Sequence, residues 1–156
     1  MSLGPTPLAA VAKGLLAGVA GTAAMTAAQT AAAKARGGSE PSTTPAQVGK
    51  RIIEGVLQRG PVGDDQIPAL NTAMHWLYGT SWGAVYGLAQ GTRHARISRG
   101  GPAFGTFVWS ASLIELPAMK LAPPVWEYPP AGLAEEVGYH LVYGLGVAAA
   151  YAALRG

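Results

Sequence analysis

Four long stretches of this 156-residue chain are nearly free of charge, and almost every Lys, Arg, Asp and Glu lies between them. A helix needs about 20 mostly apolar residues to cross a hydrocarbon core about 30 Å thick, and each stretch has that length. In lipid, only helices and closed barrels satisfy all backbone polar groups, and the chain lacks the alternating pattern of barrel strands. The sequence therefore predicts four transmembrane helices, at residues 8–33, 69–91, 102–121 and 133–154.

Composition points to the same class of protein. Hydrophobic residues make up 49% of the chain and charged residues only 12%, whereas about 25% of the residues in a soluble domain are charged. Disordered chains are instead poor in apolar residues and rich in charge. The chain has no cysteine, which excludes disulfides, thiolate metal ligands and a cysteine nucleophile. We expect an all-α fold over residues 1–156, a single transmembrane domain built as a four-helix bundle with one short amphipathic interfacial helix.

The first stretch also fits the general pattern of a secretory signal peptide. Lys13 precedes an apolar run over residues 14–24, and small residues follow it. We interpret the stretch instead as a retained transmembrane helix, although its Gly, Ala and Thr residues contribute little transfer energy. Four retained spans place both termini on the same side of the membrane.

The longest link between the stretches, residues 37–68, is predicted to contain a helix at 45–58. Thr44 is the expected N-cap, with Pro45 in the first helical position. Apolar residues recur at helical spacing on one face, and charged residues occupy the other. The apolar residues are Val48, Ile52, Ile53, Val56 and Leu57. We expect this helix to lie in the membrane interface or against one end of the bundle.

The distribution of basic residues suggests an orientation. The second link is short and basic, with Arg93, His94, Arg96 and Arg99. Links rich in Lys and Arg favour the cytoplasmic side, which predicts that both termini are cytoplasmic. The first link argues against this, because five basic residues lie in it or just before it, whereas the third holds no Lys or Arg between Ala122 and Gly132. The five are Lys34, Arg36, Lys50, Arg51 and Arg59.

Glycines at regular spacing predict close helix packing. They are Gly79, Gly83, Gly87 and Gly91 in the second stretch, and Gly14 and Gly18 in the first. Glycines four residues apart form a groove along one side of a helix, where another backbone can approach closely. We expect this groove to pack within the chain. Homodimerisation through the same groove is the alternative.

Polar side chains within the four stretches fall at one depth. His75 and His140 each lie about seven residues into their stretch, about 10 Å from its start, and Glu115 lies a similar distance before the end of the third stretch. In an alternating bundle these points share one side of the membrane. The predicted polar layer consists of His75, Glu115, Glu136, His140, Gln29, Asn71, Thr26 and Tyr78. Ionisable groups inside a span are functional candidates by default.

Three interpretations of this layer stay open. The first is a hydrogen-bond network that locks the helices together. The second is proton or ion handling, because His and Glu at one depth can relay protons. The third is a metal- or haem-binding site with a redox role, since two His and two Glu can ligate a divalent cation and His from separate helices can hold haem. The candidate ligands are His75, Glu115, Glu136 and His140.

Motifs of common enzymes are missing. The chain has no Walker loop, no HExxH and no GxSxG, and its Arg, Trp and Tyr residues form no nucleic-acid-binding pattern. We therefore predict no catalytic residue, and no cofactor is firmly implied. The expected protein is a non-enzymatic membrane protein or accessory subunit. Its expected partners are the lipid bilayer and either a second copy of the chain or a larger membrane complex, without nucleic acid.

Several motifs resemble the YagU-like family of small bacterial inner-membrane proteins. They are the segments Met74-His75-Trp76, Gly83-Ala84-Val85-Tyr86-Gly87, residues 121–127 (LAPPVWE), residues 135–143 (EEVGYHLVY) and the opening GLLAG at residues 14–18. The most specific part is the loop with Pro123, Pro124, Trp126 and Glu127, followed by the Glu-x-x-Gly-x-His pattern over residues 135–140. This resemblance implies a multi-helix protein of the bacterial cytoplasmic membrane, in a family with no firmly assigned activity. It marks Pro123, Pro124, Glu136 and His140 as family motif positions.

Overall fold

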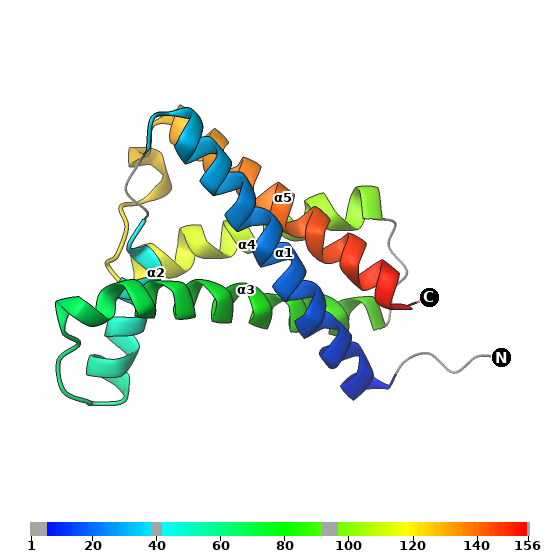
Figure 1. Cartoon of the computed structure of the whole chain (residues 1–156), viewed down its shortest axis with the longest axis horizontal. Coiled ribbons are helices and arrows are strands. Elements are labelled where there is room, and N and C mark those ends of the chain that lie inside the picture. The colour runs from blue at the N-terminus through cyan, green and yellow to red at the C-terminus, as the bar shows by residue number, and fades with distance from the viewer. Residues whose placement is uncertain (1–5, 39–41, 92–96, 156) are drawn as a thin grey trace.

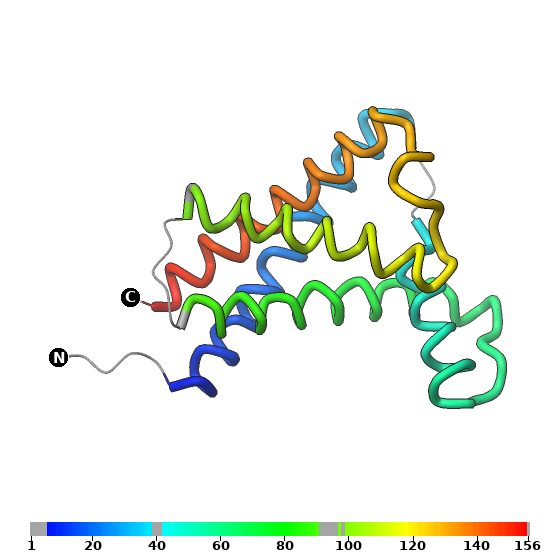
Figure 2. The backbone as a smooth tube through the Cα atoms, turned by 180° about the vertical axis from the view of Figure 1, so that it is seen from behind, coloured from blue at the N-terminus to red at the C-terminus, as the bar shows by residue number. Residues whose placement is uncertain are grey.

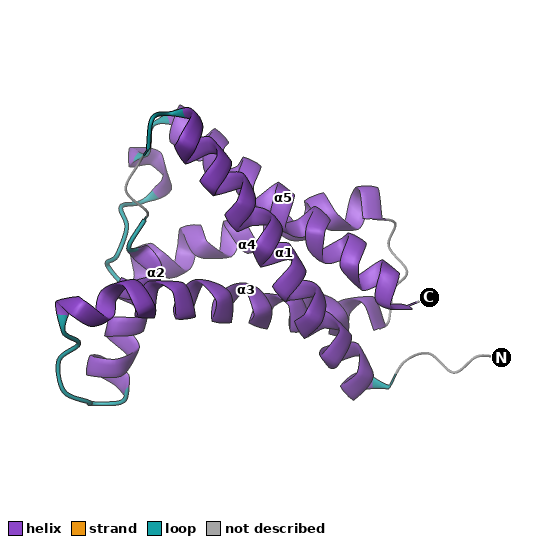
Figure 3. Ribbon diagram, viewed as in Figure 1, coloured by secondary structure: helices purple, strands orange, loops and turns teal. Residues whose placement is uncertain are grey.

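A computed structural model of the chain describes residues 6–38, 42–91 and 97–155. These residues form helices joined by short loops and contain no strand, which confirms the predicted all-α class (Figure 3). The α-helices are α1 (Pro7–Ala35), α2 (Thr44–Lys50), α3 (Ile67–Gly91), α4 (Ile97–Ala118) and α5 (Pro130–Arg155). Three shorter elements are the π-helix η1 (Arg51–Val56) and the 3-10 turns η2 (Asp64–Gln66) and η3 (Val125–Glu127).

Two of these helices, α1 and α5, are long and apolar enough to cross a membrane. Four such helices were expected. Helices α3 and α4 have 25 and 22 residues, so the shorter is about 33 Å long and matches the hydrocarbon thickness. Their hydropathy is lower because α3 carries many uncharged polar side chains and α4 holds Arg99 and Glu115.

The four long helices run alternately up and down the molecule. The start of α1, the end of α5, the end of α3 and the start of α4 lie at one end (Figure 1). The other end holds α2, η1 and the loop from Met119 to Pro129. The end of α1 and the start of α5 lie together there, at a corner away from the start of α3, and the view from behind shows the same divergence (Figure 2).

Helix α1 crosses α3 at backbone contact. A Cβ atom added to Gly18 would lie 2.9 Å from Thr80 Cα, and one added to Gly87 would lie 3.0 Å from Gly14 Cα. Gly79 and Gly83 also face α1, while Gly91 is the last residue of α3. The glycine groove is therefore filled by α1, so a second copy could use it only by displacing that helix.

Glycines that the sequence analysis did not single out form two further close crossings. A Cβ atom on Gly101 of α4 would lie 3.0 Å from the Gly144 carbonyl oxygen of α5, and Gly105 meets the same region of α5. Between α1 and α5, a Cβ atom on Gly146 would lie 3.0 Å from Gly21 Cα. Three of the four sides of the bundle thus depend on residues without a side chain.

The fourth side, between α3 and α4, is filled by aromatic rings. Trp82 of α3 packs edge-on against Phe104 and Phe107 of α4, with ring centroids 6.5 and 5.5 Å apart. Tyr86 packs at a tilt against Phe104, with ring centroids 4.8 Å apart, and edge-on against Tyr151 of α5 at 5.6 Å. Large rings need room between the backbones, so this interface is wide where the other three are narrow.

The linking helix consists of α2 followed directly by η1, over residues 44–56, where a helix at 45–58 was expected. Thr44 is its first residue rather than its N-cap, which is Thr43, and the Thr43 side chain makes no capping bond. Asn71 of α3 supplies that bond instead, because its Oδ1 accepts from the Ala46 amide at 3.0 Å. Ala46 and Gly49 are buried, while Val56 and Leu57 are 75% and 58% exposed.

Candidate functional site: a layer of paired polar side chains

Helix α3 is the hub of the polar layer. Thr26 Oγ1 of α1 lies 3.1 Å from His75 Nε2, and the Tyr78 hydroxyl donates to Glu115 Oε2 of α4 at 2.8 Å. His75 and Tyr78 are three residues apart, so they share one side of α3 but reach different neighbours. These two bonds connect three of the four long helices.

Two tyrosines attach α5 to the same helix. The Tyr143 hydroxyl donates to the Gly79 carbonyl oxygen at 2.6 Å, and Tyr151 donates to that of Gly87 at 3.2 Å. Both pairs are separated by 64 residues in the sequence, so α3 and α5 run parallel and keep one register over these two bonds. Neither tyrosine was among the site residues predicted from the sequence. The signal was present, because Tyr143 and Tyr151 repeat at the eight-residue spacing of Gly79 and Gly87.

His140 is oriented by its own helix. Its Nδ1 lies 2.8 Å from the Glu136 backbone carbonyl oxygen. A carbonyl oxygen only accepts hydrogen bonds, so Nδ1 carries the proton and Nε2 of a neutral ring keeps a free lone pair. The Glu136 carboxylate is not part of this bond and lies on the exposed side of α5.

The remaining predicted members of the layer lie elsewhere. Asn71 joins α3 to the segment before α2, since its Nδ2 donates to the Ser42 carbonyl oxygen at 3.0 Å in addition to the bond from Ala46. Gln29 is half-buried on α1, and its side chain makes no hydrogen bond to the residues that the structure describes. The interhelical bonds of the predicted layer are therefore those of His75 with Thr26 and of Tyr78 with Glu115.

The metal-site interpretation needs at least three ligands in one place. Over residues 6–38, 42–91 and 97–155, no group of three His, Asp or Glu side chains lies close enough to hold a metal ion. The candidates separate because Glu115 pairs with Tyr78 while Glu136 faces outward. Within the same residues, every fully buried side-chain nitrogen and oxygen has a hydrogen-bond partner.

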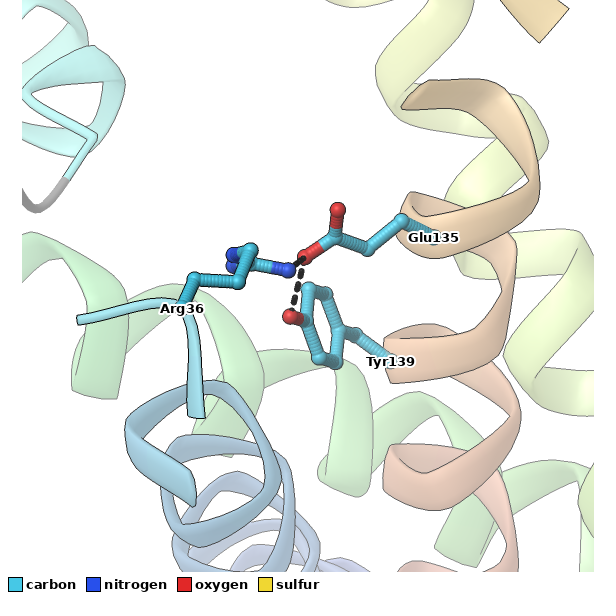
Figure 4. A network of polar contacts seen from close by, with 3 residues as sticks. All are labelled: Arg36, Glu135 and Tyr139. Carbon is cyan, nitrogen blue, oxygen red and sulfur yellow. Dashed lines mark hydrogen bonds and ion pairs between the residues drawn. The ribbon is translucent and has the colours of Figure 1, made fainter. Parts of the chain in front are cut away.

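An ion pair closes the corner where α1 ends and α5 begins. Arg36 Nη1 lies 2.7 Å from Glu135 Oε1, and the Tyr139 hydroxyl donates to the same oxygen (Figure 4). The neighbouring Tyr139 and Glu135 raise the pKa of the Arg36 guanidinium, which keeps it charged. Glu135 and Tyr139 are four residues apart and share a helix face, which is the signal that sequence reasoning could have used.

The proline-rich loop between α4 and α5 forms a tight turn. Pro124 precedes η3, and its carbonyl oxygen accepts the Glu127 amide at 3.0 Å. Pro123 and Glu127 are exposed, and Trp126 is 80% exposed. The loop thus presents a large aromatic side chain outward, at the end of the molecule that also holds the exposed residues of η1.

Comparison of the chain with protein families, with curated proteins and with solved structures finds no match.

Proposed function

We propose that this chain is a non-enzymatic, multi-pass protein of the bacterial cytoplasmic membrane, and that it serves as a structural or accessory subunit. The observation that carries the proposal is the pairing within the polar layer. Its hydroxyl, imidazole and carboxylate groups bind one another or backbone carbonyls across helix interfaces. Groups held in this way lock a bundle together, as interhelical hydrogen bonds do in membranes.

The outer surface supports four membrane spans. Large apolar side chains are exposed along α3 and α4, the two helices with lower hydropathy. They include Leu77, Val85, Leu88, Phe107 and Ile114. In a membrane, lipid would cover these exposed side chains. The close glycine crossings are also the packing mode typical of membrane helices.

Charge differs sharply between the two ends of the bundle. By sequence, the segments toward the end with the start of α1 and the end of α5 carry five basic residues and no acidic one: Lys13, Arg93, Arg96, Arg99 and Arg155. Of the basic second link, Arg93, His94 and Arg96 lie outside the described residues. The rest of the sequence carries six basic and all eight acidic residues, a net charge of −2. We place the basic end in the cytoplasm. The exposed Trp126, Val56 and Leu57 would then lie in the opposite membrane interface, as interfacial aromatic and amphipathic residues do.

Single-cysteine labelling tests this topology directly, because the chain has no cysteine to remove. Gly60→Cys lies between η1 and η2 with open space around it, and Ala153→Cys is exposed near the end of α5. In intact cells, a membrane-impermeant maleimide should label Gly60→Cys alone, and permeabilisation should expose Ala153→Cys. The reverse pattern would overturn the orientation, and labelling of both positions in intact cells would overturn the four-span topology.

Proton handling is a second candidate function. It is favoured by the free Nε2 lone pair of His140, whose Nδ1 is taken up by the Glu136 carbonyl oxygen. Purified protein in vesicles with an internal pH dye should show no proton flux above that of empty vesicles if the layer is structural. Flux that disappears in Glu115→Gln, which keeps an acceptor for Tyr78, would instead establish proton handling.

Metal or haem binding is supported by the residue types alone. Elemental analysis and an absorption spectrum of gently purified protein test it. Stoichiometric metal or a Soret band would establish a cofactor. The structure does not favour one, because His75 is bonded to Thr26 and Glu115 is bonded to Tyr78.

A further inference from the structure

A groove follows the outer face of α1 in its C-terminal half, beside α3. It has a volume of about 500 Å³ and is open to the surroundings along its length. It is lined by Ala23, Thr26, Ala27, Thr30, Ala31, Lys34 and Trp76. Helix α1 diverges from α3 toward its C-terminal end (Figure 1). There, the small alanine side chains of α1 line the groove together with Trp76 of α3.

The chemistry of the groove changes along its length. Thr26 is bonded to His75, and Thr30 donates to the Thr26 carbonyl oxygen at 2.8 Å. These hydroxyls therefore offer little to an occupant, whose contacts would be apolar. Lys34 stands at the outer end, and it makes no ion pair with any residue that the structure describes. The groove is thus apolar along the alanines of α1 and carries the Lys34 ammonium group at its outer end.

The dimensions match one leaflet of a bilayer. Ala23 and Lys34 are eleven residues apart, which corresponds to about 16 Å along a helix. Half of a hydrocarbon core about 30 Å thick is about 15 Å. With Lys34 at headgroup depth, Ala23 lies near the middle of the membrane.

We propose that this groove binds an anionic phospholipid, with the phosphate at Lys34 and one acyl chain along Ala31, Ala27 and Ala23 against Trp76. Lysine near a membrane surface attracts anionic headgroups, and its long side chain reaches the interface from a helix end. The inference rests on the proposed membrane location.

A second copy of the chain fits the groove less well. Two copies with the same membrane orientation would pair about an axis along the membrane normal, which keeps equal residues at equal depth. The Lys34 ammonium groups of the two copies would then lie at the same depth beside one interface, where like charges repel. A phospholipid brings the opposite charge instead.

The test measures phosphatidylglycerol retained by purified protein, using native mass spectrometry after exchange into a mild detergent. Lys34→Gln should weaken retention about fivefold, the size expected for one lysine at a charged lipid surface. Ala27→Leu should abolish the retention of phosphatidylglycerol, because the larger side chain would fill the groove. The matched controls are Lys120→Gln and Ala12→Leu, which change an exposed Lys and an exposed alanine of α1 outside the groove. Both should retain lipid as the unmodified chain does.

Equal retention by all four variants would overturn the lipid site. A dimer that Ala27→Leu converts to a monomer would overturn it too, by assigning the groove to a second copy. Alkaline carbonate extraction of the unmodified chain tests the membrane location separately. Release into the soluble fraction would refute the proposed function itself, whereas a membrane-retained chain without bound lipid would refute the groove alone.

Discussion

The crossing of α1 and α3 gives the sharpest prediction, because a single methyl group tests it. Gly83 lies where the two backbones touch. A Cβ atom at this position would lie 2.6 Å from the Gly18 nitrogen and would also contact the Gly14 carbonyl oxygen and Gly18 Cα. These are backbone atoms, so no side chain can rotate away, and Gly83→Ala forces the helices apart.

The size of the effect follows from two opposing terms. Inserting a methyl group into a well-packed interface costs about 1–3 kcal/mol, and the upper part of that range applies where backbones must separate. Alanine gains about 1 kcal/mol over glycine in a helix interior. The expected net loss for Gly83→Ala is therefore about 1–2 kcal/mol in free energy of unfolding.

A matched variant separates the two terms. Gly138 lies within α5, and a Cβ atom there meets nothing within 4 Å, so Gly138→Ala keeps only the propensity gain of up to about 1 kcal/mol. Unfolding in mixed micelles by SDS titration, followed by far-UV circular dichroism, should place the two variants about 2–3 kcal/mol apart. Equal stability of the two would refute the close crossing of α1 and α3.

Three further outcomes are expected in the same unfolding assay or its variants. Tyr143→Phe should lower the free energy of unfolding by about 0.5–1.5 kcal/mol, because it removes the bond to the Gly79 carbonyl oxygen without leaving a buried donor unpaired. A larger loss would show that the hydroxyl does more than join α5 to α3. Arg36→Gln should lower the free energy of unfolding by less than about 1 kcal/mol, since the pair with Glu135 is solvent-exposed, and this loss should shrink in high salt. A large loss that does not change with salt would contradict this prediction. Glu115→Gln should unfold close to the unmodified chain, because its amide oxygen can still accept from Tyr78, and marked destabilisation would require a charged carboxylate there.

Much of the fold could be predicted from the sequence. Uncharged stretches of helical length set the positions of the four long helices, and the glycine spacing on α3 predicted a backbone-to-backbone crossing. The expected layer was less well defined. His75 does pair with Thr26, but Asn71 caps α2 and the Glu136 carboxylate faces outward. The position of a residue along its helix could be predicted from the sequence. The side of the helix that would face another helix could not be predicted, because that depends on which helices pack against it.

The sequence by itself determined the all-α class and which residues share a helix face, because these follow from local periodicity and from the way charges are spaced along the chain. Only the tertiary structure decided which helix meets each face. Gly101, Gly105 and Gly144 resemble many other glycines until α4 and α5 are brought together, and Tyr143 gains its partner only when α5 lies along α3. The spacing of residues on a helix fixes an angle around its own axis, while contact also requires the position of a second axis, which depends on the packing of the whole bundle.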